Sequence, residues 1–487
     1  MRGIIMAIAH HVPASTVDAP SVPFPPDRRT PLTWSTAPIA GSGGHPPTVL
    51  EWHSAVPAAP GRLRLFVACD VRDVRRVEAA SARTGRPLGS FDIRYADCHQ
   101  PYDLPLDGDA VRAVADEGVR LTLASDPATE PLWIFSGPDA PVERRPVLLL
   151  DTEDPSAPAA ALHHHLTSIG SVQPFGWMEG CVLDALYDLH TTFPADTRAE
   201  TALRDHLAVY VHGIRLRYED PRSRPANDRV YGIEATLPFA VVAKRDPRHP
   251  TLRLAIDSWD ARTDPHGCVK DAPTTAEGCY TVAYPMAVLA QATGDARLRE
   301  AAIRQLRVRR RRLTWDDDLY LRLLPDGSRI YRNWARAYAW YLLGLVRTLS
   351  ELGDQPDTDD LWDEAARAAR LALSRRNAVG IWDCYLGEPA TAAETCGSAG
   401  IAAALALGVE RGRFAADREG AVAQEAWEVL CDRLTPDGWL DGSSPSNKGG
   451  EELQRSGYRM LSGVGSGLLG QLGAALVRIG AVKDWTR

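Results

Sequence analysis

The stretch "WARAYAWYLLGLVRTLSELG" at residues 334–353 is a long apolar run with the length of a helix, and it carries an arginine, Arg336, among aromatic side chains near its start. Apolar residues lie on nearly every face of the helix that this run predicts. Such a pattern is typical of a helix that packs against neighbours on both sides. We therefore expect this helix to lie in the inner layer of a helical domain.

Comparable runs recur along the C-terminal two-thirds of the chain. The first helix of each successive pair is predicted to start near residues 175, 230, 278, 334, 394 and 461. Regular spacing of this kind is typical of arrays of helical hairpins. We predict six hairpins closed into an (α/α)6 barrel over residues 153–487, although an open solenoid of hairpins has the same sequence texture.

The N-terminal third has a different texture. Residues 1–48 are rich in Pro, Ser and Gly and are predicted to form an irregular arm. From residue 49 to 152, stretches such as "RLRLFVACDV" alternate apolar and polar residues, which predicts an antiparallel β-sandwich domain. A packing or capping role for this domain is favoured over sugar binding, because a fold alone does not specify a function.

The composition argues against several classes of function. A net charge of -8 disfavours nucleic acid and anionic membranes as partners, and the basic run at 307–313 is predicted to be a solvated face of an outer helix. The eight cysteines are scattered without CxxC spacing, which indicates reduced, mostly buried thiols. The start of the chain is a poor signal peptide and no apolar run reaches the roughly 20 residues of a membrane span, so a cytoplasmic location is expected.

The predicted starts of the inner helices carry the residues that suit carbohydrate binding. Segments such as "QPFGWMEG", "NDRVYGIE", "TTAEGCYTVAYP" and "AETCGSAG" place aromatic residues beside acids and glycines. Aromatic faces stack on sugar rings, and acids and amides bind the hydroxyl groups. The mouth of the barrel is therefore the expected site.

Five of these segments, in order, resemble a known family. "FGWMEGCVLDALYDL", "YPMAVLAQATGDARLREAAIRQL", "NWARAYAWYLLGLVRTL", "AETCGSAGIAAALALGV" and "SGVGSGLLGQLGAALV" are similar to segments of the unsaturated uronyl hydrolases, glycoside hydrolase families 88 and 105 of the six-hairpin glycosidase superfamily. The resemblance covers about residues 160–487 and leaves out the β region. It implies removal of a terminal 4,5-unsaturated uronic acid: an acid protonates the double bond, water adds, and the resulting hemiketal opens with loss of the sugar.

The resemblance also implies residues that bind the substrate. Arg336 matches the arginine that faces the uronate, and Trp340 matches the aromatic residue four positions later, which the i,i+4 spacing places on the same helix face. An arginine fork binds a carboxylate in two places, which a lysine does not. Trp177 and Tyr338 are expected to shape the sugar site.

Two more positions are compared with the family. Arg322 stands where many relatives have a histidine, which indicates a more anionic substrate. Glu394 resembles a residue at the funnel, but it has the alternative of capping its own helix.

The acid pair departs from the family pattern. Asp228 is predicted to open a helix at the position of one active-site aspartate, with a simple N-cap as the alternative. The proton-donating aspartate has no counterpart at its usual place, and the nearest acid is Glu277, with Asp271 as a further candidate. We predict that Asp228 and Glu277 carry out the proton transfer.

The predicted function is hydrolysis of uronic-acid-containing oligosaccharides. The alternatives are a hydrolase of saturated glucuronides, a polysaccharide lyase on the same fold, and a non-catalytic sugar-binding or scaffold protein. No cofactor or metal is expected: the consecutive His163, His164 and His165 point in different directions on a helix and cannot form an i,i+4 metal pair. A homo-oligomer remains open.

Overall fold

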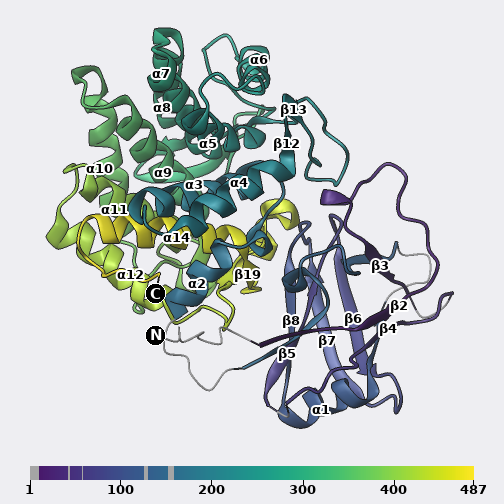
Figure 1. Ribbon diagram of the computed structural model, residues 1–487. Coiled ribbons are helices and arrows are strands. Elements are labelled where there is room, and N and C mark those ends of the chain that lie inside the picture. The colour runs from purple at the N-terminus through teal and green to yellow at the C-terminus, as the bar shows by residue number, and fades with distance from the viewer. Residues whose placement is uncertain (1–9, 42–43, 58, 125–129, 152–157, 487) are drawn as a thin grey trace.

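The computed structural model describes residues 10–41, 44–57, 59–124, 130–151 and 158–486. Figure 1 shows a domain of strands at the lower right and a larger domain of helices at the upper left. Within the described residues, no helix combines the length and the apolar character needed to cross a lipid bilayer.

The β domain contains two main antiparallel sheets. Its elements are β1 (His10–Pro13), β2 (Thr16–Asp18), β3 (Thr36–Ile39), β4 (Thr48–Glu51), β5 (Gly61–Phe66), β6 (Val74–Ser81), β7 (Pro87–Arg94), β8 (Pro101–Leu106), α1 (Gly108–Glu117), β9 (Val119–Leu123), β10 (Leu132–Phe135) and β11 (Val147–Leu150). One sheet has the order β1-β11-β5-β8, the other β2-β4-β9-β6-β7, and β3 pairs with β10. Apolar side chains such as Leu63, Val77 and Leu121 fill the space between the sheets.

The predicted irregular arm is partly wrong. The described part of residues 10–48 contains β1, β2 and β3, and β4 begins at Thr48. β1 and β2 lie at the edges of their sheets, where prolines are tolerated because one side of the strand needs no ladder partner. Because prolines and glycines lie between these short strands, the sequence pattern did not predict that the strands pair with other strands of the domain. Residues 1–9 and 42–43 lie outside the described part.

The helical domain is a closed double ring. The inner helices are α3 (Trp177–Thr192), α5 (Pro238–Arg245), α7 (Tyr284–Thr293), α9 (Ala335–Leu352), α11 (Thr395–Glu410) and α14 (Gly463–Arg478), and the outer ones are α2 (Pro158–Leu166), α4 (Thr197–Tyr210), α6 (Leu252–Arg262), α8 (Ala296–Leu313), α10 (Asp359–Leu373) and α12 (Ala421–Cys431). Each inner helix packs on the next, and α14 packs on α3. This closure confirms the (α/α)6 barrel and excludes the open solenoid.

Close approach between inner helices depends on small residues. A Cβ at Gly344 of α9 would lie 2.3 Å from the carbonyl carbon of Cys279, and a Cβ at Gly400 of α11 would lie 2.6 Å from the Cβ of Ala339. The inner helices therefore pack almost backbone to backbone. This packing brings the starts of the six helices around one central mouth.

The helical domain also contains short strands and one further helix. They are β12 (Val211–His212), β13 (Arg215–Leu216), β14 (Thr274–Thr275), β15 (Thr314–Trp315), β16 (Asp318–Leu323), β17 (Arg329–Arg332), β18 (Leu440–Ser443), α13 (Gly450–Arg455) and β19 (Met460–Ser462). β14 and β17 flank β16 in one small sheet, and β18 pairs with β19.

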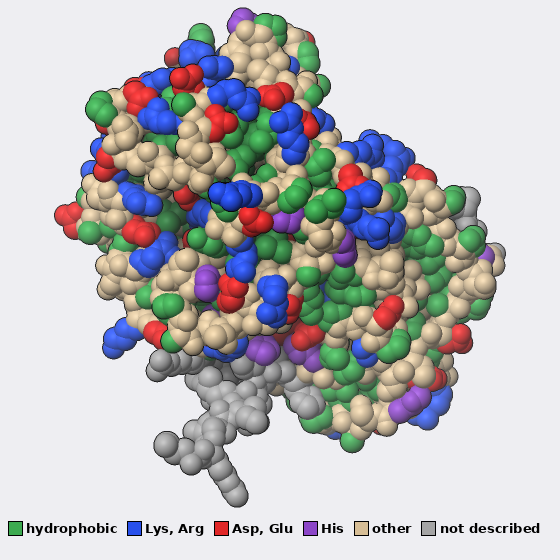
Figure 2. All heavy atoms as spheres, turned by 45° about the horizontal axis from the view of Figure 1, so that its top comes forward, with side chains coloured by type: hydrophobic (Ala, Val, Ile, Leu, Met, Phe, Trp, Pro, Cys, Tyr) green, Lys and Arg blue, Asp and Glu red, His purple; other side chains and the backbone are tan. Residues whose placement is uncertain are grey.

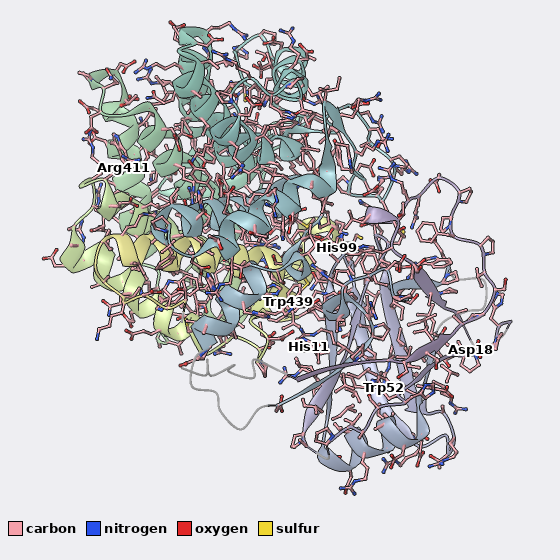
Figure 3. The ribbon with its side chains drawn as sticks, viewed as in Figure 1. His11, Asp18, Trp52, His99, Arg411 and Trp439 are labelled. Atoms are coloured by element: carbon pink, nitrogen blue, oxygen red, sulfur yellow. The ribbon has the colours of Figure 1, made fainter. Side chains whose placement is uncertain are left out.

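Buried charges join the two domains. Arg64 of β5 donates to Asp103 at 2.7 Å and to Asp437 of the helical domain at 2.5 Å. His11 of β1 lies 3.1 Å from the same Asp437. Figure 3 shows His11, His99 and Trp439 gathered along this junction. The contacts hold the β domain beside the barrel mouth.

The basic run on α8 is only partly a solvated face. Arg307 and Arg310 pair with Asp360 of α10, and basic and acidic side chains lie close together over much of the helical face in Figure 2. Arg309, in contrast, is fully buried, so the prediction was wrong for this residue. The eight cysteines are free, and all but Cys431 are buried, as expected.

Candidate functional site

A cavity of about 210 Å³ lies at the mouth of the barrel. We call it the mouth cavity. Its helical-domain side is lined by Trp177, Met178, Pro221, Glu234, Glu277, Arg322, Trp334, Arg336 and Trp340 together with residues 446–448, and Arg72 and Asp97 reach it from the β domain. The structure thus brings together five of the eight predicted site residues: Glu277, Arg336, Trp340, Trp177 and Arg322.

Arg336 lies in the first turn of α9 and is 3 % exposed. Its guanidinium carbon lies 4.6 Å above the ring of Trp334, and one terminal nitrogen donates to the carbonyl of Pro445. Among the described residues its Nε has no hydrogen-bond partner, and no carboxylate lies within ion-pair distance of the side chain. A buried cation without a counter-ion is costly, so the site is suited to receive an anion.

Two tryptophans form an aromatic wall beside Arg336. Trp177, the first residue of α3, packs edge-on against Trp340, with ring centroids 5.5 Å apart. Tyr280 stacks on Trp340 from the barrel interior. Trp177 enters its helix through Gly176, whose φ of 129° is a conformation that side chains other than glycine rarely adopt. The wall offers indole surface for a sugar ring.

Glu277 lies on the loop between β14 and the π-helical turn Cys279–Ala283 that leads into α7. The carboxylate is 8 % exposed, and its Oε2 has no partner among the described residues. Buried Arg309 holds this loop: it donates to the carbonyl of Thr275 at 3.0 Å, and a Cβ at Gly278 would lie 2.0 Å from its guanidinium. The position of Glu277 therefore depends on Arg309, which was predicted from the sequence to lie on a solvated helix face.

Glu234 is the acid that the sequence analysis missed. It lies in the short 3-10 helix Ile233–Thr236 that precedes α5. Burial and the neighbouring charge of Glu277 raise the pKa of Glu234 to about 8, with Arg322 opposing the shift. A carboxyl group with a pKa in this range holds its proton at neutral pH. The signal was present, because Glu234 ends the segment "NDRVYGIE" from which Asp228 was chosen.

Asp271 positions Glu234 and does not line the cavity. Its carboxylate accepts a hydrogen bond from the backbone N–H of Ile233 at 3.2 Å and pairs with Arg262 at the same distance. It therefore holds the start of the turn that carries Glu234. Asp271 as the proton donor, the further candidate from the sequence, is not supported by this position.

Arg322 projects from β16, the middle strand of the small sheet at the mouth. Its guanidinium carbon lies 6.0 Å from the ring centroid of Tyr331. Its Nε, like that of Arg336, has no partner among the residues that the structure describes. The helical-domain side of the mouth cavity therefore has two arginines, Arg322 and Arg336, and two carboxyl groups, those of Glu234 and Glu277.

The prediction for Asp228 was wrong. No helix begins there: the residue has a φ of 51° in the loop after β13, and the next helical turn starts at Ile233. Its carboxylate accepts from the N–H of Leu216 and from Arg215, and the hydrogen bond from Arg215 holds the pKa of Asp228 below its ordinary value. It lies outside the mouth cavity, and the N-cap alternative also fails.

Two further predicted site residues, Tyr338 and Glu394, have structural roles. Tyr338 is two positions from Arg336, so the two side chains project from opposite sides of α9, and its hydroxyl accepts from Arg375 at 3.0 Å. Glu394 is fully buried and caps α11 by accepting from the N–H of Gly397 at 2.5 Å. It also accepts from the N–H of Ser444. The capping alternative holds for Glu394.

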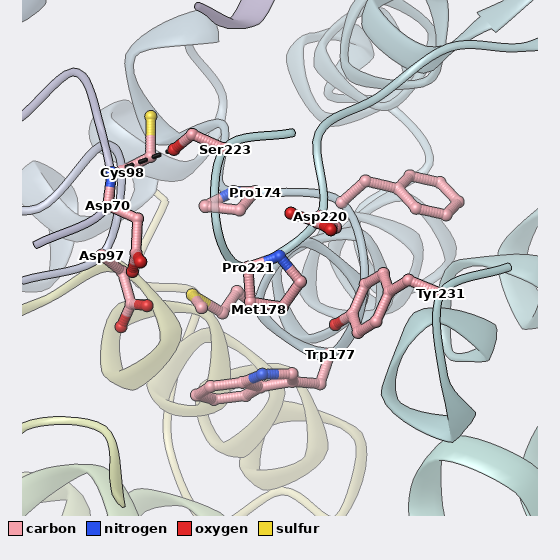
Figure 4. Close-up of a pocket in the computed structure, with 11 residues that line it drawn as sticks. Asp70, Asp97, Cys98, Pro174, Trp177, Met178, Asp220, Pro221, Ser223 and Tyr231 are labelled. Carbon is pink, nitrogen blue, oxygen red and sulfur yellow. Dashed lines mark hydrogen bonds between the residues drawn. The ribbon is translucent and has the colours of Figure 1, made fainter. Parts of the chain in front are cut away.

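The β domain supplies side chains that the sequence did not indicate. Lys448 lies 2.5 Å from Asp70 and 2.7 Å from Asp97, which belong to two loops of the β domain. Figure 4 shows Asp97, Trp177, Met178 and Pro221 around a smaller pocket that continues from the mouth cavity. The site is therefore built from both domains.

The three consecutive histidines lie on α2, away from the mouth cavity. His163 and His165 are buried, and burial lowers the pKa of both, to about 4 for His163 and about 3 for His165. In the part of the chain that the structure describes, no three His, Cys, Asp or Glu side chains are arranged to hold a metal ion.

The fold and part of the sequence match known proteins. Residues 276–469 match the family model of Glycosyl Hydrolase Family 88. A possible GH105 member from Salmonella enterica is similar, with 15% identity, a TM-score of 0.57, and coverage of 71% of this chain and 99% of that one. No curated protein sequence matches the chain.

Two further solved structures share the fold but differ in reaction. An unsaturated glucuronyl hydrolase specific for heparin has 12% identity, a TM-score of 0.51, and coverage of 67% of this chain and 97% of that one. A polysaccharide lyase has 16% identity, a TM-score of 0.51, and coverage of 67% and 98%. At such identities the likeness shows the fold alone. The helical domain thus has the same fold as these proteins, and residues 276–469 within it match the Glycosyl Hydrolase Family 88 model.

Proposed function

We propose that the protein is a glycoside hydrolase that removes a terminal 4,5-unsaturated uronic acid from an oligosaccharide by hydrating its double bond. The observation that carries the proposal is the pairing in the mouth cavity of two carboxyl groups, Glu234 and Glu277, with a buried arginine, Arg336, that has no carboxylate partner. A six-hairpin fold and the family match over residues 276–469 support it.

Arg336 binds the uronate carboxylate. The N–H groups of its planar guanidinium can donate to both oxygens of a carboxylate. Trp177 and Trp340 pack against the apolar face of the sugar, which fixes the height of the ring above the acids. The double bond next to the carboxylate is thereby placed between Glu234 and Glu277.

Glu234 acts as the general acid, because its raised pKa keeps the proton on it at neutral pH. It protonates C4 of the C4–C5 double bond, and positive charge develops at C5 and the ring oxygen. Glu277 takes a proton from a water molecule as the water oxygen bonds to C5. The product is a hemiketal that opens and releases the neighbouring sugar, so one water is consumed per bond.

The decisive experiment follows the ultraviolet absorbance of the unsaturated uronate. Hydration removes the absorbance of a lyase-made unsaturated disaccharide. A lyase, the reaction of one structural neighbour, raises the absorbance of a saturated polymer. A hydrolase of saturated glucuronides releases reducing sugar without any change in absorbance. Loss of absorbance supports the proposal, and either of the other two results overturns it.

Glu277→Gln then tests the acid pair. The amide cannot accept a proton from water, so we expect turnover to fall by about 10³-fold with the melting temperature within a few degrees of wild type. Glu388→Gln, which removes a surface carboxylate paired with Arg455, is the matched control and should keep full activity. Near-normal turnover of Glu277→Gln would assign the base to another residue.

A further inference from the structure

The mouth cavity has two ends that are lined by different residues. Arg336 and Glu277, from the helical domain, lie at one end and are 3 % and 8 % exposed. Arg72 and Asp97, from the β domain, lie at the other end; Asp97 is 8 % exposed, and 43 % of the Arg72 side chain is exposed. Under the proposed function the terminal uronate lies at Arg336, and the sugar that follows it lies at the end formed by Arg72, Asp97 and Lys448, which we call the rim.

The two ends also differ in charge. At the uronate end the cavity is lined by two guanidinium groups, those of Arg322 and Arg336. Among the described residues neither has a carboxylate within ion-pair distance, so this end is suited to a uronate carboxylate. At the rim the charges are already paired, because Lys448 lies between Asp70 and Asp97 and Arg72 donates to Asp70 at 2.7 Å.

The rim still offers unused hydrogen-bonding groups. The hydroxyl of Ser446 is buried without a partner among the described residues, and it lines the cavity next to Lys448. The Nε and one terminal nitrogen of Arg72 donate to Asp70 and to the carbonyl of Pro221, which leaves its other terminal nitrogen free for a ligand. These groups suit the hydroxyls of a neutral sugar.

We propose that Arg72 and Asp97 of the β domain, together with Lys448 and Ser446, bind the sugar that follows the terminal uronate and select an uncharged one. The inference rests on the proposed function. A sulfate or carboxylate on this second sugar would lose its hydration shell at the rim, where both positive charges are already paired. It would also lie close to the carboxylate of Asp97. Burial of an ion without a counter-ion is unfavourable. The β domain is therefore a specificity element of the active site.

The test uses pairs of unsaturated disaccharides with the same uronate and linkage. In one pair the second sugar is an N-acetylhexosamine with or without a 6-sulfate, and in the other it is rhamnose or galacturonic acid. We expect kcat/KM to be at least tenfold higher for the uncharged member. No absorbance change with any of the four would mark failure of the proposed function. Turnover with equal or better use of the charged member would overturn the inference alone.

Charge-changing variants locate the selection. Asp97→Asn keeps the shape of the side chain but leaves the rim with one positive charge, so the preference for the uncharged member should fall at least fivefold. Arg72→Gln leaves one negative charge and should increase the preference. The uronate site is untouched in both. An equal change of kcat/KM for charged and uncharged members would show a structural role only and would overturn the inference.

Asp92→Asn is the matched control. Asp92 is also a β-domain carboxylate paired with an arginine, Arg94, at 2.7 Å, but it lies outside the mouth cavity. The ratio of kcat/KM values should not change in this variant. Melting temperatures of all three variants show whether the β domain remains folded, and the ratio within each variant is independent of the amount of folded protein.

Discussion

The mouth of the barrel and the interior beneath it contain the same residue types but differ in how their charges are paired. Both regions have an arginine from α9, Arg336 at the mouth and Arg347 about three turns further along the same helix face. Arg347 donates to Asp188 at 2.5 Å and to Gln471 at 2.8 Å. Arg336 donates to the backbone carbonyl of Pro445 and has no carboxylate within ion-pair distance among the described residues.

The interior arginine has a carboxylate partner, although its Nε, like that of Arg336, has no hydrogen-bond partner among the described residues. Asp184 accepts from the hydroxyls of Tyr280 and Tyr284. Burial favours a raised pKa for Asp188, but Arg347 more than offsets it and holds the pKa below its ordinary value. Burial alone therefore does not mark a functional residue. An arginine whose counter-ion is supplied by the fold is structural, whereas an arginine that lines a cavity without a counter-ion among the described residues is available for an anionic ligand.

The largest effect is expected for Glu234→Gln. The amide has no proton to give to the double bond, so kcat should fall by about 10³-fold. Glu351→Gln changes a carboxylate that pairs with Lys244 away from the mouth cavity and is the control for the same chemical change. If Glu234→Gln retained more than a tenth of wild-type kcat, the general acid would have to be another residue.

Substitution of the two arginines of α9 should affect stability and substrate binding differently. Arg347→Met leaves Asp188 buried without its partner, which costs about 3–5 kcal/mol of unfolding free energy. Arg336→Met removes no ion pair and should leave stability nearly unchanged, but it should raise KM about 10–100-fold through loss of charge-assisted hydrogen bonds. Denaturant unfolding and steady-state kinetics measure both. If Arg336→Met is less stable than Arg347→Met, the contrast between the two regions is contradicted.

The pH dependence of kcat and of stability distinguishes the mouth of the barrel from its interior. Because the pKa of Glu234 is raised to about 8, the acid is protonated at neutral pH, and kcat should fall about tenfold per unit above pH 8. The folded chain also holds a proton there that the unfolded chain releases, so stability falls as pH rises from the ordinary glutamate pKa through 8. Glu234→Gln should lack this loss, and melting curves between pH 6 and 9 check it.

The smallest effect is expected for Asp228→Asn. Asp228 is bound to Arg215 and to the N–H of Leu216 outside the mouth cavity, and the amide oxygen keeps the backbone contact. Activity should stay within twofold of wild type under the conditions used for Glu277→Gln. A loss comparable to that of Glu277→Gln would restore Asp228 to the acid pair.

The structure agrees with the positions that were predicted from spacing along one helix. Arg336 and Trp340 are four positions apart, and both reach the mouth cavity. Tyr338 was misplaced because helical geometry turns a residue two positions away to the other face. Asp228 and Glu234 occur in one short segment, and only the loop conformation decides which of them faces the cavity.

The amino-acid sequence by itself determined a series of six helical hairpins, because apolar periodicity and the regular spacing of helix starts are local properties. The tertiary structure decided that the hairpins close into a barrel, since closure depends on α14 packing on α3. The sequence also determined that an arginine and aromatic residues line the barrel mouth. The tertiary structure alone decided that Glu234 partners Glu277, that Arg309 holds the Glu277 loop, and that Arg72 and Asp97 join the site. These contacts connect residues far apart in the chain, and their charges and burial depend on neighbours that no local pattern specifies.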